Sequence, residues 1–577
     1  MIYEFVNLRK LFSYKVMTKR IFLISVLYLL TIAIQAVPAK RGILQMLKLK
    51  DGTEVQAQLC GDERFHWWTT IDGRRYIADG DNYKEVDGLT LNRMAVRRRS
   101  AAFRQSATRK RPMYQSRVSG KLNSYLGKKK GLVILVEFKD TKFNPAHDCT
   151  KFDDILNTEG YTTDEGFVGS VADYFKAQSN DLFELNFDVV GPVQLKYDVE
   201  YYGGNDNEGQ DKNAEAMIVE ACLGVDDQVN FNDYDWDNDG EVEEVFVVYA
   251  GKGEADGGDA TTIWPHMYEL SYSHNDLTLD GAHINTYACA NELSGGGSIN
   301  GIGTFCHEFS HCLGYPDFYD TLNSETYGMA YYDLMDAGCY NGDGFIPCGY
   351  SAYEKWLAGW IELTELSNEN VTVDALKPMS EGGSGYVIYN DGHPDEFYIL
   401  ENRQQTNWDS ALFGRGLMIT HVDYDEMLWY LNFPNSLIDE SSEYVTKYRY
   451  PTNDHMRLTI MHADNDDDYE TYNGLTNDLY PYLQNDSLTS TSIPAATFYN
   501  ATKQGDNLMH GAILNITQND DNTMSFYYRA PIIETGISEL HIDNPSSNVI
   551  YDLQGRRLSP NSRQKGFFII NGKKIIR

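Results

Sequence analysis

The residues best suited to chemistry lie in residues 301–320, with the sequence GIGTFCHEFSHCLGYPDFYD. If the first half forms a helix, His307 and His311 project from one face, where two imidazoles can share a metal ion. A catalytic zinc site needs three protein ligands and a position for water. Glu308 lies beside that face and could take a proton from the activated water and pass it to a leaving amine. The segment therefore predicts zinc-dependent hydrolysis.

The third zinc ligand must come from beyond this helix. Gly314 offers a break where the chain can turn back toward the metal. Asp317 follows at the spacing HExxHxxGxxD, which resembles the metzincin pattern HExxHxxGxxH with an aspartate at the last position. Asp320, or a glutamate from a later helix, could take this place instead. A bare HExxH also occurs by chance on surface helices, but Gly314 and Asp317 argue against that interpretation.

Two further residues have expected roles near the metal. Metzincins carry a tight turn with a methionine beneath the zinc, and YYDLMDAG supplies Met335 at about the right distance, although a core methionine would give the same pattern. Tyr340 could donate a hydrogen bond to the transition-state oxyanion.

A second group of carboxylates, DWDNDGEVE at residues 235–243, alternates as in a calcium loop before a glycine that permits a sharp turn. A complete EF-hand would have glutamate where Phe246 stands, so a nearby glutamate would have to close the shell. An acidic turn on a solvated surface would look similar. The expected ligands of a structural calcium ion are Asp235, Asp237, Asp239, Glu241 and Glu243, with Glu244 as an alternative.

The N-terminus has the pattern of a secretory signal peptide. Lys19 and Arg20 precede an apolar stretch at 21–34, and the small residue Ala36 follows it. The signal region is predicted to be residues 1–36, with Met17 as the natural start. The apolar run is shorter than the roughly 20 residues of a spanning helix, so we expect a secreted or cell-surface protein without a permanent membrane span.

Residues 37–130 are predicted to be a propeptide with a basic linker. Strand-like pieces such as 54–59 come first, and a stretch rich in Lys and Arg follows at 97–130, where trypsin-like enzymes could cut. An uncut, solvated linker would have the same composition. Cys60 could in principle place a thiolate on the zinc and keep a zymogen inactive, but a single cysteine is more often a packed core residue.

The remaining chain predicts an α+β fold. GLVILVEF, from Gly131, reads as a buried strand, VGSVADYFKAQS at 168–179 as a helix, and 183–194 as a strand, so we place a protease domain at 131–365. Recurrent strand patterns such as EFYILENR and GLMITHVDYD, without a helical period, predict a β-sandwich-like domain at 366–530. The tail, 531–577, resembles C-terminal sorting signals for outer-membrane export machinery in some Gram-negative bacteria. A plain β extension is the alternative.

Composition narrows the choice of partners. The chain has 577 residues and a formal charge of −35, which would repel nucleic acid. Eight cysteines are too few for a disulfide scaffold at this length, although Cys339 and Cys348 are near enough in sequence to pair.

Several segments in this order resemble the immune inhibitor A family of secreted bacterial metalloproteases. They include GKKKGLVILVEFKD, SVADYFKAQSNDLFELNFDVVGPV, HEFSHCLGYPDFYD, SAYEKWLAGW and ILENRQQTNWD, and the resemblance spans about 130–530. It implies a metzincin-like protease domain that acts on protein or peptide substrates, with His307, His311 and Asp317 as zinc ligands and Glu308 as base. The rival interpretations are a surface adhesion protein with a vestigial metal site and a zinc hydrolase acting on a non-peptide bond.

Overall fold

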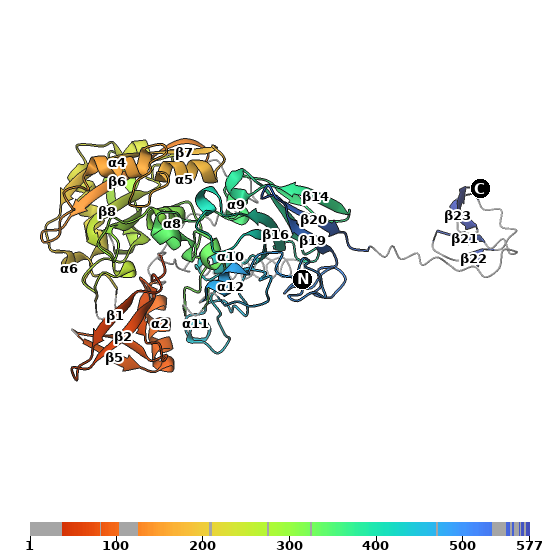
Figure 1. Ribbon diagram of the computed structural model, residues 1–577, viewed down its shortest axis with the longest axis horizontal. Helices are drawn as coiled ribbons and strands as arrows, with labels where there is room; N and C mark the ends of the chain where they lie inside the picture. Colours follow the sequence, from red (N-terminus) through yellow and green to blue (C-terminus); the bar gives the residue numbers. More distant parts are fainter. Residues whose placement is uncertain are drawn as a thin grey trace, which may run out of the picture. The chain divides into compact units, whose positions relative to one another are not determined.

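The computed structural model describes residues 37–102 and 125–532, except 81, 207–209, 274–275, 324–325 and 469–470, and short pieces of 550–576. The predicted signal peptide and most of the basic linker lie outside these residues. The chain divides between Ala530 and Pro531 into two compact units, shown in Figure 1. Among the described residues, no helix has both the length and the apolar character needed to cross a membrane.

The first structured region is an antiparallel sheet covered by a helix. Its five strands follow chain order, and Phe65 and Trp67 pack against Leu91 and Ala95 of the helix. The strand predicted at 54–59 is confirmed and runs on to Asp62. The elements are β1 (Leu44–Lys48), β2 (Glu54–Asp62), β3 (Phe65–Thr69), β4 (Arg75–Asp79), β5 (Asn82–Val86) and α2 (Gly88–Ala102).

A mixed five-stranded sheet with the order β7-β6-β8-β12-β9 forms the centre of the next region. Its first four strands are parallel, and the edge strand β9 is antiparallel to β12. The strand predicted at 183–194 is confirmed. The bounds are β6 (Gly127–Glu137), β7 (Phe183–Gln194), β8 (Val245–Lys252), β9 (His266–Glu269) and β12 (Thr286–Leu293), beside the small hairpin β10 (Leu277–Leu279) and β11 (Ala282–Ile284).

Both faces of this sheet are covered, which explains the unbroken apolar sequence of β6. Val133 and Leu135 belong to one core and Leu132 and Ile134 to another, because successive side chains of a strand point to opposite faces. In Figure 1, α4 and α5 lie beside β6 and β7. The helices are α4 (Cys149–Asn157), α5 (Val171–Gln178), α6 (Val199–Tyr202), α7 (Ala214–Val225), α8 (Gly303–Cys312) and α9 (Ala352–Leu357).

The region after Trp360 contains two sheets that share one apolar core. A five-stranded sheet has the order β13-β15-β16-β17-β18 and a three-stranded sheet the order β14-β20-β19. Leu400 and Ile419 of the larger sheet meet Phe526 and Ile513 of the smaller one. The strands are β13 (Leu363–Glu365), β14 (Val371–Leu376), β15 (Gly385–Tyr389), β16 (Glu396–Arg403), β17 (Gly416–Asp423), β18 (Leu458–Ile460), β19 (Ala512–Gln518) and β20 (Met524–Arg529).

The expectation of strands without helices in this region was wrong in one respect, because three short helices connect the strands. They are α10 (Glu426–Tyr430), α11 (Glu443–Thr446) and α12 (Tyr472–Thr476). Each has an N-terminal cap, from Asp425, Ser442 and Thr471 respectively. Helices of about one turn leave no period in the sequence, so only the capping residues could have indicated them.

A buried arginine joins β16 to the helical region before α9. Arg403 donates to both carboxylate oxygens of Asp409, at 2.8 and 3.0 Å, and to the carbonyl oxygen of Gly349 at 3.0 Å. Glu401 lies 3.3 Å from the same guanidinium. The sequence ILENRQQTNWD, at 399–409, thus contains all three residues of this buried charge cluster.

The second unit, from Pro531 onward, contains a small antiparallel sheet with the order β22-β21-β23-β24. Its strands are β21 (Ile550–Asp552), β22 (Arg557–Leu558), β23 (Phe567–Ile570) and β24 (Lys573–Ile576). Short strands were predicted in this tail, and their presence is confirmed.

Candidate metal centre

Helix α8 carries the residues predicted to bind metal, and all ten of its residues are buried. Two phenylalanines anchor it to the central sheet. Phe305 stacks on Phe246 of β8 with 3.8 Å between the ring centroids, and both Phe305 and Phe309 meet the ring of Phe187 on β7 edge-on. These two phenylalanines, four positions apart on one face, therefore fix how the helix is rotated against the sheet.

The chain turns back toward the helix at the predicted break. Gly314 has a φ of +102°, a conformation that favours glycine, and Asp317 returns to the two histidines. Nε2 of His311 lies 3.0 Å from Nε2 of His307. Oδ1 of Asp317 lies 3.1 Å from Nε2 of His307 and 3.3 Å from Nε2 of His311. Three side-chain atoms thus converge in a buried site.

Hydrogen bonds on the far side of each imidazole determine which nitrogen carries the proton. Nδ1 of His307 lies 2.8 Å from the carbonyl oxygen of Leu334, and Nδ1 of His311 lies 2.9 Å from that of Tyr315. Because a carbonyl oxygen can only accept, Nδ1 is the protonated atom and each Nε2 presents a lone pair. Oδ1 of Asp317 has no hydrogen-bond donor among the described residues. Three electron-rich atoms therefore face one another, an arrangement that a cation would stabilise.

The spacing of these atoms fits a tetrahedral ion. Two ligands bonded at about 2.0–2.1 Å to a tetrahedral centre lie about 3.3 Å apart, and the three separations are 3.0, 3.1 and 3.3 Å. The alternative third ligands are engaged elsewhere. Asp320 accepts the backbone N–H groups of Leu322 and Asn323, and Glu354 of the later helix α9 accepts from Ser351.

Burial and neighbouring charges set the protonation of the cluster. Burial lowers the pKa of His311, and the nearby carboxylate of Asp317 offsets this only in part. Burial alone would raise the pKa of Asp317, but the electrostatic attraction of His311 and His307 outweighs burial and lowers that pKa overall. Both shifts favour the forms that bind a cation, neutral imidazole and ionised carboxylate.

Glu308 is fully buried next to this cluster. Its Oε1 accepts the backbone N–H of Val37 at 2.8 Å, while Oε2 has no hydrogen-bond partner in the described part of the chain. Burial raises the pKa of Glu308 well above its usual value. The N–H of Val37 counteracts the rise, and the charge of Asp317 adds to it. A carboxyl group with a raised pKa can both accept and donate a proton in catalysis.

The turn around Met335 connects the two sides of the cluster. The carbonyl oxygen of Leu334 accepts from His307, and the carbonyl oxygen of Met335 accepts the N–H of Phe318 at 2.8 Å. Asp333 holds the turn by accepting the N–H of Met335 at 2.8 Å. The methionine itself is fully buried.

The first described residues, 37–41, run through the site. Besides the bond from its N–H to the buried glutamate, Val37 accepts from the indole Nε1 of Trp264 at 3.1 Å. The hydroxyl of Tyr340 donates to the carbonyl oxygen of Pro38 at 2.7 Å. Tyr340 therefore contacts a peptide carbonyl next to Val37, the residue that contacts Glu308.

The cysteines are not part of the cluster. The eight cysteines, all within the described part of the chain, form no disulfide, and Cys339 and Cys348 are not bonded to each other. Sγ of Cys60 lies 3.6 Å from Oγ1 of Thr69 and 3.8 Å from the carbonyl oxygen of Gln58, within its own sheet. In this structure the start of the predicted propeptide, at Val37, contacts Glu308, whereas Cys60 contacts residues of its own sheet.

The predicted calcium loop is partly assembled. Oxygen atoms of Asp235, Asp237 and Asp239 lie within 4.8 Å of one another, on a partly exposed surface. Glu243 instead accepts the N–H of Trp236, and Oε2 of Glu241 lies 3.8 Å from Nδ1 of His283. The structure therefore gathers the three aspartates and gives both glutamates other partners.

Comparison with known proteins places this site in a family. Residues 121–361 match the family model described as "Immune inhibitor A peptidase M6, catalytic domain". The chain carries an M6 peptidase domain. The M6 domain contains the whole His307, His311 and Asp317 cluster, together with Glu308 and Met335.

Two curated proteins are similar to part of this chain. The pre-pro-metalloprotease PrtV of Vibrio cholerae serotype O1 (strains M66-2 and ATCC 39315 / El Tor Inaba N16961) is 26% identical over 268 residues, which cover 41% of this chain and 28% of PrtV. Immune inhibitor A of Bacillus thuringiensis subsp. alesti is 24% identical over 302 residues, 43% of each chain. The matched part of the chain thus spans less than half the length of these relatives.

One residue beside the cluster was missed in the sequence. Asn432, which lies beyond the M6 match, makes two hydrogen bonds of 2.6 Å to Asp317, and 115 positions separate the two residues. No spacing rule connects positions so far apart. The asparagines of the NFPN sequence at 432–435 indicate a turn, but not its partner.

Proposed function

We propose that this chain is a secreted, zinc-dependent endopeptidase that cleaves extracellular or host proteins. One observation carries the proposal: three lone-pair donors of His307, His311 and Asp317 converge within 3.3 Å beside a buried glutamate. The M6 match supports the class of enzyme, and the turn at Met335 supports a metzincin-like fold for the domain.

In this proposal His307, His311 and Asp317 hold the zinc ion and Glu308 is the general base. When bound, zinc would act as a Lewis acid that lowers the pKa of water and polarises the substrate carbonyl. Glu308 takes a proton from the attacking water and gives it to the leaving amine. Tyr340 donates a hydrogen bond to the oxygen of the substrate carbonyl as negative charge develops there.

Cleavage of unfolded casein by the processed protein tests this function. Chelator should abolish cleavage and added zinc should restore it. Glu308→Gln should bind zinc normally but cleave at least about 100-fold more slowly, because the general base is lost. Glu443→Gln, at an exposed ion pair with Lys447, is the matched control and should cleave normally. If the zinc-loaded, processed protein leaves casein and other denatured proteins intact, the adhesion protein becomes the better interpretation.

We further propose that residues 37–130 are a propeptide that keeps the enzyme latent. The occupied Oε1 of Glu308 and the occupied hydroxyl of Tyr340 support this. A signal-peptide cut after Ala36 would turn the nitrogen of Val37 into an α-ammonium group next to Glu308. One relative is described as a pre-pro-metalloprotease, and the basic residues at 97–130 offer a site for removal.

The remaining assignments are proposals of the same kind. Asp235, Asp237 and Asp239 would hold a structural calcium ion, which metal analysis after dialysis against calcium would test. Residues 131–365 and 366–530 would be the protease domain and a β-sandwich-like domain. The unit at 531–577 would act as a sorting tail for export machinery. Deleting that tail should leave casein cleavage unchanged and prevent export.

A further inference from the structure

One side chain from outside the M6 match holds Asp317 at two points. Nδ2 of Asn432 donates to Oδ2 of Asp317 at 2.6 Å, and Oδ1 of Asn432 accepts the backbone N–H of Asp317 at 2.6 Å. The first bond ties down the carboxylate oxygen that the histidines do not face. The other oxygen, Oδ1, is thereby left directed at the two imidazoles.

The backbone at Asn432 suits this task. The residue follows α10, has a φ of +62° and is 1% exposed. Most side chains cost about 1–2 kcal/mol in this left-handed conformation, whereas asparagine, aspartate and glycine adopt it readily. Its carbonyl oxygen also accepts from the hydroxyl of Thr321 at 2.6 Å. The conformation and these bonds together fix where the amide group points.

Neighbouring residues hold the same two chain segments together without touching Asp317. Nδ2 of Asn435 donates to the carbonyl oxygen of Phe318 at 2.7 Å. Oγ of Ser436 accepts the N–H of Leu322 at 3.1 Å. Residues 432–436 therefore lie along 317–322, and within this contact Asn432 is the residue that contacts the carboxylate.

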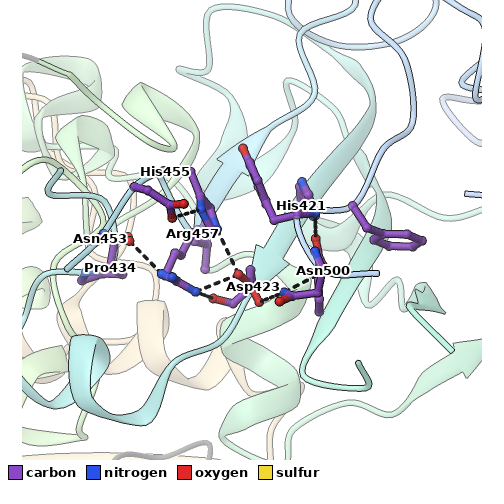
Figure 2. A network of polar contacts seen from close by, with 12 residues as sticks. His421, Asp423, Pro434, Asn453, His455, Arg457 and Asn500 are labelled. Carbon is purple, nitrogen blue, oxygen red and sulfur yellow. Dashed lines mark hydrogen bonds and ion pairs between the residues drawn. The ribbon is translucent and has the colours of Figure 1, made fainter. Parts of the chain in front are cut away.

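The segment at 432–436 is itself anchored to strand β17, as Figure 2 shows. Nδ2 of Asn453 donates to the carbonyl oxygens of Pro434 and Ser436, at 3.2 and 2.8 Å. Arg457 donates to Oδ1 of Asn453 at 2.8 Å and to Oδ2 of Asp423, the last residue of β17, at 2.7 Å. These hydrogen bonds, together with the backbone of 432–436, therefore connect the larger sheet to Asp317.

We propose that Asn432 is a positioning residue of the metal centre, which fixes the Asp317 carboxylate so that Oδ1 meets the ion. This rests on the proposed zinc site. Partners that orient a metal ligand typically contribute 10–100-fold to metal affinity. The metal centre then extends past residue 361 into the region of the two C-terminal sheets, which takes part in building the site.

Two substitutions in the full-length chain separate positioning from folding. Asn432→Asp keeps the size, the backbone conformation and the acceptor for the Asp317 N–H, but places a carboxylate oxygen against Oδ2. Asn432→Gly keeps the backbone conformation and removes both bonds. Asn435→Ala is the matched control, because it breaks the bond to Phe318 in the same loop, together with bonds to Arg457 and Leu458, and leaves Asp317 untouched. Circular dichroism identifies the variants that fold.

Zinc affinity, measured by competition with a chromogenic chelator, and the visible spectrum of the cobalt-substituted protein are the readouts. Asn432→Asp and Asn432→Gly should bind zinc about 10–100-fold more weakly and change the cobalt spectrum. Asn435→Ala should stay within about threefold of the wild type. Wild-type affinity in a folded Asn432 variant, or an equal loss in Asn435→Ala, would overturn the positioning role. If one Asn432 variant does not fold, the other decides. Absence of zinc binding in the wild type would instead reject the proposed function.

Discussion

The backbone nitrogen of Val37 lies 2.8 Å from Oε1 of Glu308, although 271 positions separate the two residues. The contact joins the first described residue to the carboxylate best placed for proton transfer. A carboxylate oxygen that accepts a strong hydrogen bond is less available to water. This contact should therefore reduce the ability of Glu308 to accept a proton from water.

Removing residues 37–41 should therefore activate the unprocessed chain. A chain beginning at Gly42 keeps β1 to β5 but loses the bonds to Glu308, Trp264 and Tyr340. We expect it to cleave casein before trypsin treatment, at a rate at least about tenfold above the chain that begins at Val37. After trypsin treatment the two chains should have equal rates. Equal rates before treatment would show that these five residues do not block the site.

Asp317→Ala should remove the third metal ligand. We expect its zinc affinity to fall at least about 100-fold, because two imidazoles and water bind zinc more weakly than a three-ligand site. Asp320→Ala is the matched control, since that carboxylate accepts two backbone N–H groups nearby. Isothermal titration with zinc checks both variants. The assignment fails if Asp320→Ala loses zinc and Asp317→Ala retains it.

Buried His266 should make stability depend on pH. Burial lowers its pKa to about 4, and its bond to the carbonyl of Trp264 counteracts this only in part. The unfolded chain takes up a proton below about pH 6.5 while the folded chain stays neutral, so stability is complete above that pH. As the pH falls from about 6.5 to 4, up to about 3 kcal/mol of unfolding free energy is lost.

His266→Gln, which cannot titrate, isolates this contribution. Melting temperatures are measured in chelator, to remove effects of bound metal. Between pH 7 and 4 the melting temperature should fall further for the wild type than for the variant. From pH 7 to 8 the plots of melting temperature against pH should be parallel for the two proteins. Parallel curves over the whole range would contradict the prediction.

Arg403→Ala should be among the most destabilising single changes outside the metal centre. It removes the guanidinium that pairs with the buried carboxylates of Asp409 and Glu401, a loss of about 3–5 kcal/mol. Arg403→Lys should also destabilise the fold, because an ammonium group cannot replace the forked contact. Urea denaturation checks both. Lys447→Ala, at an exposed ion pair, should change stability by less than about 1 kcal/mol. A similarly small change in Arg403→Ala would contradict this account.

Local patterns were enough to predict the elements that carry the cluster. The apolar run of β6 and the alternation of β7 lie within single strands. The spacing of His307, His311 and Asp317 lies within one helix and the turn after it. In each case the pattern depends on residues only a few positions apart, so the local sequence is enough to predict the element.

Contacts between distant segments could not be predicted in this way. The approach of Asn432 to Asp317 depends on how α10 packs, and the position of Val37 depends on the whole N-terminal sheet. The one-turn helices α10, α11 and α12 were missed because their stability comes from caps and tertiary packing. No periodic signal in a single sequence reports such contacts.

Anomalous diffraction at the zinc absorption edge tests the central claim most directly. Crystals of the protein grown with zinc should show one strong peak about 2.0–2.2 Å from Nε2 of His307, Nε2 of His311 and Oδ1 of Asp317. An empty cluster at saturating zinc, or a peak that only other residues coordinate, would contradict the proposed metal centre and the enzyme built on it.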